Sequence, residues 1–153
     1  MKKHYHTTID DINKSKTLPL WALTGCVPQF SIRVYNNTSQ ESKVIIIESD
    51  DGKEQSEHII LPHSSLEIDG LKYSKLITLD GIWSYDPKNI YKSGIDDRFW
   101  FVEELGLFSK KQEIKLQLES NGFLYILTKE QSFPATIFFQ QPNGFPIKLS
   151  QGE

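Results

Sequence analysis

The sequence predicts an all-β protein, built as an antiparallel β-sandwich, with a small β-barrel as the alternative. Turn signals recur about every ten residues through the middle of the chain, among them Asp51-Gly52, Asp69-Gly70 and Asp80-Gly81. The segments between these turns are short, and their apolar residues alternate with polar ones or form β-branched runs. Short strands at regular turn spacing are typical of sandwiches and barrels, whereas parallel βαβ units have long helical segments between strands.

The first strand is predicted at 29–34. Phe30, Ile32 and Val34 alternate there with polar residues, so that one face of the strand is apolar. The polar residues 35–39 are typical of a turn and are expected to end this strand.

The run 44–47 is continuously apolar and β-branched, which predicts a strand covered on both faces. The Asp51-Gly52 turn is expected to return the chain as a hairpin strand at about 54–61, because Gly readily adopts positive φ. Further strands are expected around 71–79 and 82–85.

The segment 113–127 predicts a second hairpin. Apolar and polar residues alternate over 113–118, which predicts one wet face, and the apolar run 123–127 follows Asn121-Gly122. Asn-Gly between two such runs is the strongest short-range hairpin signal. A last strand is expected at 136–139, followed by a turn or edge cap over 140–146.

The segment 90–108 is open to two interpretations. Phe99 to Val102 is aromatic-rich and favours a strand or an irregular segment. Alternatively, Asp96 or Asp97 caps one short helix near 95–106, with Phe99 and Val102 at helical spacing.

Aromatic residues are densest between 85 and 101. Tyr85, Tyr91 and Trp100 are the candidates for an aromatic binding surface, because aromatic faces suit both sugar rings and apolar partners. Burial of the same rings in a sandwich core is the other interpretation, and it is the one we favour.

Composition places the chain among ordinary globular proteins. With 153 residues and 38% hydrophobic residues, it is long enough to bury a core without disulfides or metals. Its net charge of −3 and the lack of a clustered basic face argue against nucleic-acid binding. The single cysteine excludes an internal disulfide. No apolar run reaches the length of about 18 residues that a membrane-spanning helix needs.

The only cysteine, Cys26, ends the apolar stretch 17–26, and residues 1–16 before it are polar and carry four lysines. Leu23-Thr24-Gly25-Cys26 resembles the lipobox of bacterial lipoprotein signal peptides, in which an aliphatic residue and small residues precede the cysteine. The segment 141–146 is also similar to C-terminal segments of small proteobacterial lipoproteins.

This resemblance implies that residues 1–25 are a cleaved leader and that 26–153 form a single β domain carrying a lipid on Cys26. Val27 stands where an aspartate would imply retention at the inner membrane, so the resemblance implies an outer-membrane location facing the periplasm. Without the leader, 13 basic and 18 acidic residues give a net charge of −5. The alternative is a disordered tail over 1–25 and a cytoplasmic protein.

No motif predicts catalysis, a metal or another cofactor. His58 and His63 are the only histidines after the leader, and the nearby Ser64 lies outside any nucleophile motif. The carboxylate pairs Asp50-Asp51 and Glu103-Glu104 are interpreted as turn or surface residues rather than as an acid–base pair. We therefore expect a protein that is not an enzyme.

These observations predict a lipid-anchored envelope domain with a non-catalytic binding or structural role. Its expected partners are the membrane, through the lipid, and a protein. The alternative function is that of an interaction protein, such as an immunity protein or a secretion-system accessory, since an acidic surface steers a basic partner.

Overall fold

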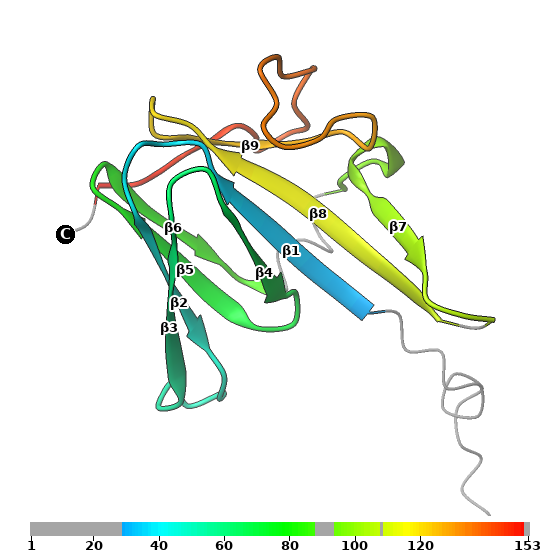
Figure 1. The fold of residues 1–153 in the computed structure, drawn as a ribbon. Helices are drawn as coiled ribbons and strands as arrows, with labels where there is room; N and C mark the ends of the chain where they lie inside the picture. The colour runs from blue at the N-terminus through cyan, green and yellow to red at the C-terminus, as the bar shows by residue number, and fades with distance from the viewer. Residues whose placement is uncertain (1–28, 88–93, 108, 152–153) are drawn as a thin grey trace, which may run out of the picture.

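Two β-sheets packed face to face form the domain (Figure 1). The structure is a computed structural model, and it describes residues 29–87, 94–107 and 109–151. The expected leader, Cys26 and Tyr91 lie outside the described residues. The elements are β1 (Gln29–Asn36), β2 (Ser42–Ile47), β3 (Gln55–Ile60), β4 (Ser65–Asp69), β5 (Tyr73–Thr78), β6 (Gly81–Tyr85), the 3₁₀ turn η2 (Asp97–Phe99), β7 (Phe101–Glu104), β8 (Lys110–Leu118), β9 (Phe123–Ile126) and β10 (Ile147–Lys148).

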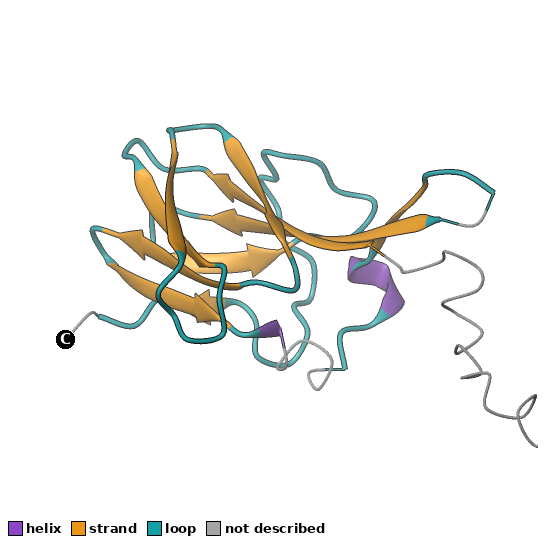
Figure 2. Ribbon diagram, turned by 90° about the horizontal axis from the view of Figure 1, so that it is seen from below, coloured by secondary structure: helices purple, strands orange, loops and turns teal. Residues whose placement is uncertain are grey.

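Sheet A has the strand order β10-β9-β8-β1-β4, and β7 also pairs with β8. Sheet B has the order β3-β2-β5-β6. Within the described residues both sheets keep separate edges, so the predicted sandwich is confirmed and the alternative of a closed barrel is not found (Figure 2).

One pair of neighbouring strands in sheet A is parallel, although the rest of the pairing is antiparallel. β1 runs beside β8 over its whole length, from Gln29 opposite Lys111 to Asn36 opposite Leu118. The two strands are far apart in the sequence, so the turn pattern of the chain contains no signal for their pairing. This long ladder forms the centre of sheet A (Figure 1).

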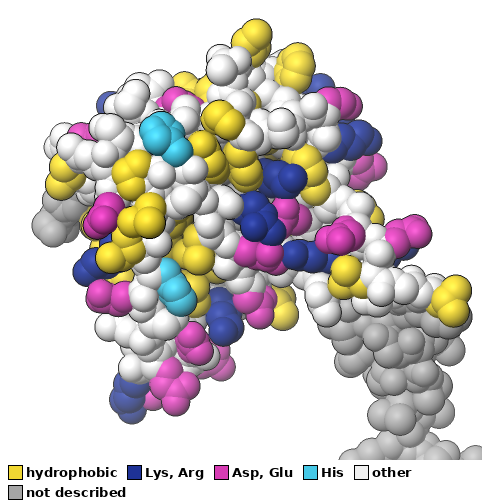
Figure 3. All heavy atoms as spheres, in the orientation of Figure 1, with side chains coloured by type: hydrophobic (Ala, Val, Ile, Leu, Met, Phe, Trp, Pro, Cys, Tyr) yellow, Lys and Arg dark blue, Asp and Glu magenta, His cyan; other side chains and the backbone are white. Residues whose placement is uncertain are grey.

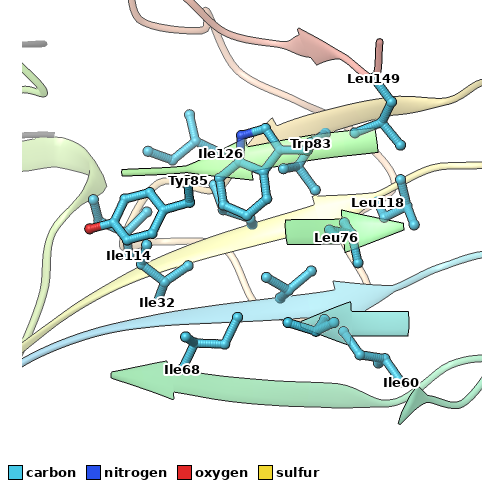
Figure 4. Packing of buried hydrophobic residues seen from close by; sticks show 14 of the residues in the cluster. Ile32, Ile60, Ile68, Leu76, Trp83, Tyr85, Ile114, Leu118, Ile126 and Leu149 are labelled. Atoms are coloured by element: carbon cyan, nitrogen blue, oxygen red, sulfur yellow. The ribbon is translucent and has the colours of Figure 1, made fainter. Parts of the chain in front are cut away.

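The core lies between the two sheets and follows the two-residue period of the strands. Ile32 and Ile114 from sheet A meet Leu76 and Trp83 from sheet B (Figure 4). All four are buried, with at most 8% of each exposed. Complete burial of an aliphatic side chain stabilises the fold by roughly 1.5–3 kcal/mol, so this layer is the main source of stability.

The C-terminal segment links the two sheets along one side of the sandwich. Ile147 pairs with Leu124 of β9 in sheet A. A few residues later, the Ile82 amide of β6 in sheet B donates to the Ser150 carbonyl at 2.6 Å, and the Ser150 amide donates back at 2.9 Å. Gly81 makes room for this crossing, since a Cβ there would lie 2.7 Å from the Ser150 carbonyl oxygen.

The predicted hairpins form at Asp51-Gly52 and Asn121-Gly122, joining β2 to β3 and β8 to β9. At the second turn, the Gly122 amide donates to Glu119 and the Phe123 amide donates to the Asn121 side chain, both at 3.0 Å. Gly122 has φ +77°, a left-handed conformation that glycine adopts without steric cost. The Asn-Gly signal is therefore confirmed in detail.

Three boundary or burial predictions are wrong. β1 continues through Tyr35 and Asn36, because β4 and β8 pair with it there. β2 is not covered on both faces: Val44 and Ile46 face the core, whereas Ile45 is half-buried on the outer face of sheet B. The outer face of β8 is only partly wet, because Gln117 is completely buried beneath the segment around Ala135.

The predicted strand at 136–139 is also wrong, and this segment is irregular. Ile137 and Phe139 are exposed, at 72% and 55%. Side-chain amides hold the chain here in place of a strand ladder: Gln141 accepts from the Ile126 amide at 2.9 Å and donates to the Ile126 carbonyl at 3.0 Å. The final strand, β10, comes later, directly after the expected cap.

The segment 94–104 contains both structures that the sequence left open. Asp96 caps the single turn η2 by accepting from the Arg98 amide at 2.7 Å. β7 follows at once and pairs with β8. Phe99, the last residue of η2, is fully buried. Among the described residues, no helix has the length and apolar character needed to cross a bilayer.

We predict that Gly122→Val lowers the free energy of unfolding by about 1–2 kcal/mol, because a branched side chain disfavours the left-handed backbone. A Cβ would meet only Asp80, at 3.8 Å, so the destabilisation comes from the backbone conformation and not from a steric clash. Thermal unfolding should shift down by roughly 3–8 °C. Gly122→Asn is the matched control and should cost less, because Asn tolerates positive φ. Equal melting temperatures for Gly122→Val and the unchanged protein would contradict the turn geometry.

Candidate functional site

The outer face of sheet A carries a group of charged side chains that are linked by ion pairs. Because alternate residues of a strand share a face, odd-numbered residues of β1, β4, β7 and β8 point outward together. The strand register sets them in rows across the sheet. One row joins Glu67, Arg33 and Lys115, and the next joins Ser31, Glu113 and Phe101. Figure 3 shows charged side chains of both signs gathered over β1 and β8.

These charged side chains bind one another. Arg33 is the centre: its Nε donates to Glu113 Oε2 at 3.0 Å, and its terminal nitrogen reaches Glu67 Oε2 at 2.5 Å. Lys111 forms a further ion pair with the other oxygen of Glu67. Lys115 lies 3.9 Å from Glu113 Oε1. We call Arg33, Glu67, Lys111, Glu113 and Lys115 the charge network.

The charge network is partly buried. The Glu113 side chain is only 11% exposed and that of Lys111 19%. Burial opposes the charge on Arg33, but its hydrogen bond to Glu113 and the charges of both glutamates outweigh this, so the pKa of Arg33 is raised. The hydrogen bond from Lys111 lowers the pKa of Glu67 most, and the charges of Lys111 and Arg33 lower it further. The Glu67 ion pairs thus stabilise the fold above the ordinary glutamate pKa and are lost as the pH falls through the lowered value.

An open cleft of about 850 Å³ lies beside the charge network, between β7 and the centre of sheet A. Its polar lining includes Arg33, Lys115 and Lys129, and Trp100 and Phe101 form its aromatic side. The Lys115 ammonium lies 3.9 Å from the centre of the Phe101 ring, so this lysine is held by a carboxylate and an aromatic face together. The cleft therefore combines fixed charges of both signs with aromatic surface.

The three predicted aromatic residues have different places. Trp100 lines the cleft, is half-buried, packs on Phe30 with ring centres 5.3 Å apart, and donates to the Ile95 carbonyl at 3.2 Å. Tyr85 is a core residue, 4% exposed, and its hydroxyl donates to the Gly70 carbonyl at 2.8 Å. Its ring therefore stays in the core and presents no face at the surface. Tyr91 lies outside the described residues.

The histidines and carboxylate pairs are spread over the surface. His58 is exposed on β3, with Nε2 3.2 Å from Ser56 Oγ, and His63 lies in the turn between β3 and β4. Asp51 closes its own turn by accepting from Ser49 at 2.7 Å. Of this set, only Glu103 lines the cleft. The part of the chain that the structure describes holds no cluster of three or more His, Cys, Asp and Glu side chains that suits a metal ion.

Comparison with protein-family models, with curated proteins and with solved structures gave no match. The candidate site is therefore inferred from this chain's own geometry.

Sequence reasoning missed the charge network. Its signal was present as alternation: Arg33 among apolar neighbours in the first strand, and Glu113 and Lys115 in the same phase of the 113–118 segment. Alternation showed that these residues share the outward face of their strands. It did not show that the two strands are neighbours, because that pairing is long-range.

We predict that Glu113→Gln destabilises the protein by about 1–2 kcal/mol, because it removes the charge that compensates half-buried Arg33. Glu67→Gln is the matched control on the exposed side of the same arginine, and it should cost less than about 1 kcal/mol because water screens it. The measurement is urea unfolding at neutral pH. Equal losses in the free energy of unfolding for the two variants would contradict the central place of Glu113.

Proposed function

We propose that this protein is a non-catalytic binding domain of the bacterial cell envelope, anchored by a lipid on Cys26 and facing the periplasm. The cleft beside the charge network is its binding site. The observation that carries the proposal is the combination in one open cleft of half-buried, mutually fixed charges with the rings of Trp100 and Phe101. The support for the anchor is the lipobox-like Leu23-Thr24-Gly25-Cys26.

The chemistry of the cleft defines the class of ligand. Lys115 and Lys129 offer donors for carboxylates, and Glu103 and Asp97 offer acceptors for ammonium or hydroxyl groups. Trp100 and Phe101 supply surface on which a sugar ring or an apolar group can stack. Because positive and negative groups are interleaved, the matching ligand carries both signs. Disaccharide–peptide fragments of the cell wall have this chemistry.

A second candidate function is protein binding, and the exposed edge of the sandwich favours it. Ile59 and Leu61, on and just after edge strand β3, are 58% and 54% exposed. Hydrophobic side chains gather over β3 and β4 in Figure 3. Edge strands with exposed apolar residues suit pairing with a partner strand. This candidate corresponds to the interaction-protein alternative.

We predict that native protein starts at Cys26, has the mass of an acylated product and fractionates with membranes. Cys26→Ser should abolish both the added mass and the membrane association, because Cys26 is the only cysteine of the chain. Two acyl chains on this residue suffice for stable anchoring. Intact-mass spectrometry and membrane fractionation are the measurements. A full-length, unmodified chain in the soluble fraction would refute the anchor.

We predict that soluble disaccharide–peptide fragments of peptidoglycan bind the cleft, and that Lys115→Glu weakens binding by about tenfold, because one charge-assisted contact becomes repulsive. Lys75→Glu is the matched control, since Lys75 lies on β5 in the other sheet. Calorimetric titration is the measurement, and melting curves show that both variants are folded at the titration temperature. A neutral glucan oligosaccharide, which carries no charge, tests whether binding to the cleft depends on the charges of the ligand. No binding at millimolar fragment, or equal weakening by both variants, would refute this ligand class.

A further inference from the structure

The hairpin of β7 and β8 extends beyond the sandwich (Figures 1 and 2). Burial along β8 locates the end of the core: Ile114 and Leu116 are buried, whereas Gln112 in the same phase is exposed. Val102, which pairs with Gln112, is 54% exposed on β7. In the part of the chain that the structure describes, no strand of sheet B therefore covers this end of the hairpin.

The turn of this hairpin presents leucines to solvent. Leu107 is 93% exposed and Leu105 is 45% exposed. The turn is held by its backbone, since the Leu105 amide donates to the Ser109 carbonyl at 2.8 Å. We call Leu105 and Leu107 the leucine tip. Exposed large apolar residues at the end of a projecting hairpin are costly in water unless another apolar phase receives them.

The strand register brings the start of the domain to this same end. Gln29, the first residue of β1, pairs with Lys111, the second residue of β8. Glu104 pairs with Lys110 immediately before the turn. Cys26 precedes Gln29 by three positions in the sequence, and three residues span at most about 10 Å. A lipid on Cys26 therefore places the membrane surface at the end of the domain where the leucine tip projects.

We propose that the leucine tip inserts into the bilayer interface and, together with the lipid, orients the domain on the membrane. This inference rests on the proposed anchor at Cys26. The charges flanking the tip are balanced, with Glu103 and Glu104 on β7 and Lys110 and Lys111 on β8. Insertion of the leucines, rather than attraction to anionic headgroups, is thus the driving interaction. The opposite end of the sandwich carries Leu79 in the β5–β6 turn, near Asn121 of the β8–β9 turn, and it faces away from the membrane.

The test uses the full chain with Cys26→Ser, so that no acyl chain contributes, and vesicles of phosphatidylethanolamine and phosphatidylglycerol. A single cysteine is introduced as Leu107→Cys, or as Leu79→Cys for the control, and labelled with an environment-sensitive fluorophore. At position 107, vesicles should shift the emission to the blue and shield the label from iodide, with little dependence on salt. The label at position 79 should behave as in water.

A second pair of variants measures the contribution of the leucines. Leu105→Ser with Leu107→Ser should weaken vesicle binding by about tenfold. Leu79→Ser with Ile137→Ser removes two exposed apolar residues elsewhere, which are 80% and 72% exposed, and should change binding less than twofold.

Each outcome decides the proposal. A label at position 107 that stays accessible to iodide on vesicles, a failure to bind vesicles at millimolar lipid, or equal effects of the two double variants would overturn tip insertion. The anchor is tested separately by the mass of native protein. Acylated Cys26 with an accessible label at position 107 would refute the tip alone, and a shielded label on a chain that the cell never acylates would refute the anchor alone.

Discussion

The parallel ladder between β1 and β8 is the interaction on which the rest of this structure depends. It places Ile32 beside Ile114 and Val34 beside Leu116, which together form the sheet A side of the core. On the opposite face the same register brings Arg33 beside Lys115. One ladder therefore creates both the hydrophobic layer and the charge network, because a strand presents alternate residues to opposite faces.

Buried polar side chains on the outer face of sheet A have hydrogen-bond partners. Gln117, fully buried, donates to the Ala135 carbonyl and accepts from the Ala135 amide, both at 2.8 Å. Arg33 Nε donates to the Glu113 carboxylate, so each of these charged groups also has a partner. Buried polar groups are tolerated when each has a partner, and these partners also hold the segment from β9 to β10 against the sheet.

The direction of β1 connects the proposed anchor, the cleft and the leucine tip. Its first residue lies beside the start of β8, so the lipid expected at Cys26, the cleft lining and the projecting hairpin are all connected to the same pair of strands. The proposed anchor at this end would leave the edge strand β3 and the turn at Leu79 accessible to partners. Membrane attachment and ligand binding would then share the β7–β8 hairpin, whose tip would meet the membrane and whose Glu103 and Lys111 line the cleft.

Local signals account for the parts of the fold that were predicted. Asn121-Gly122 fixes a hairpin because glycine accepts the positive φ that the turn needs, and alternation around Ile114 fixes which residues face inward. The same reasoning failed at 136–139, where four apolar or β-branched residues look like a strand but lie outside the core. Strand propensity reports how well a residue suits a pleated, half-buried surface, and only a neighbouring strand supplies that surface.

The sequence by itself determined the all-β class, the tight turns, the inward phase of most strands and the lipobox-like segment at Cys26. The tertiary structure alone decided that β1 pairs with β8, that Arg33 meets Glu67 and Glu113, and that Leu107 projects beyond the sandwich. The physical reason is the separation along the chain over which each interaction acts. Turn geometry and side-chain alternation act between residues close in the chain, whereas the charge network depends on which distant strands share the core, and that choice is made by the packing of the whole domain.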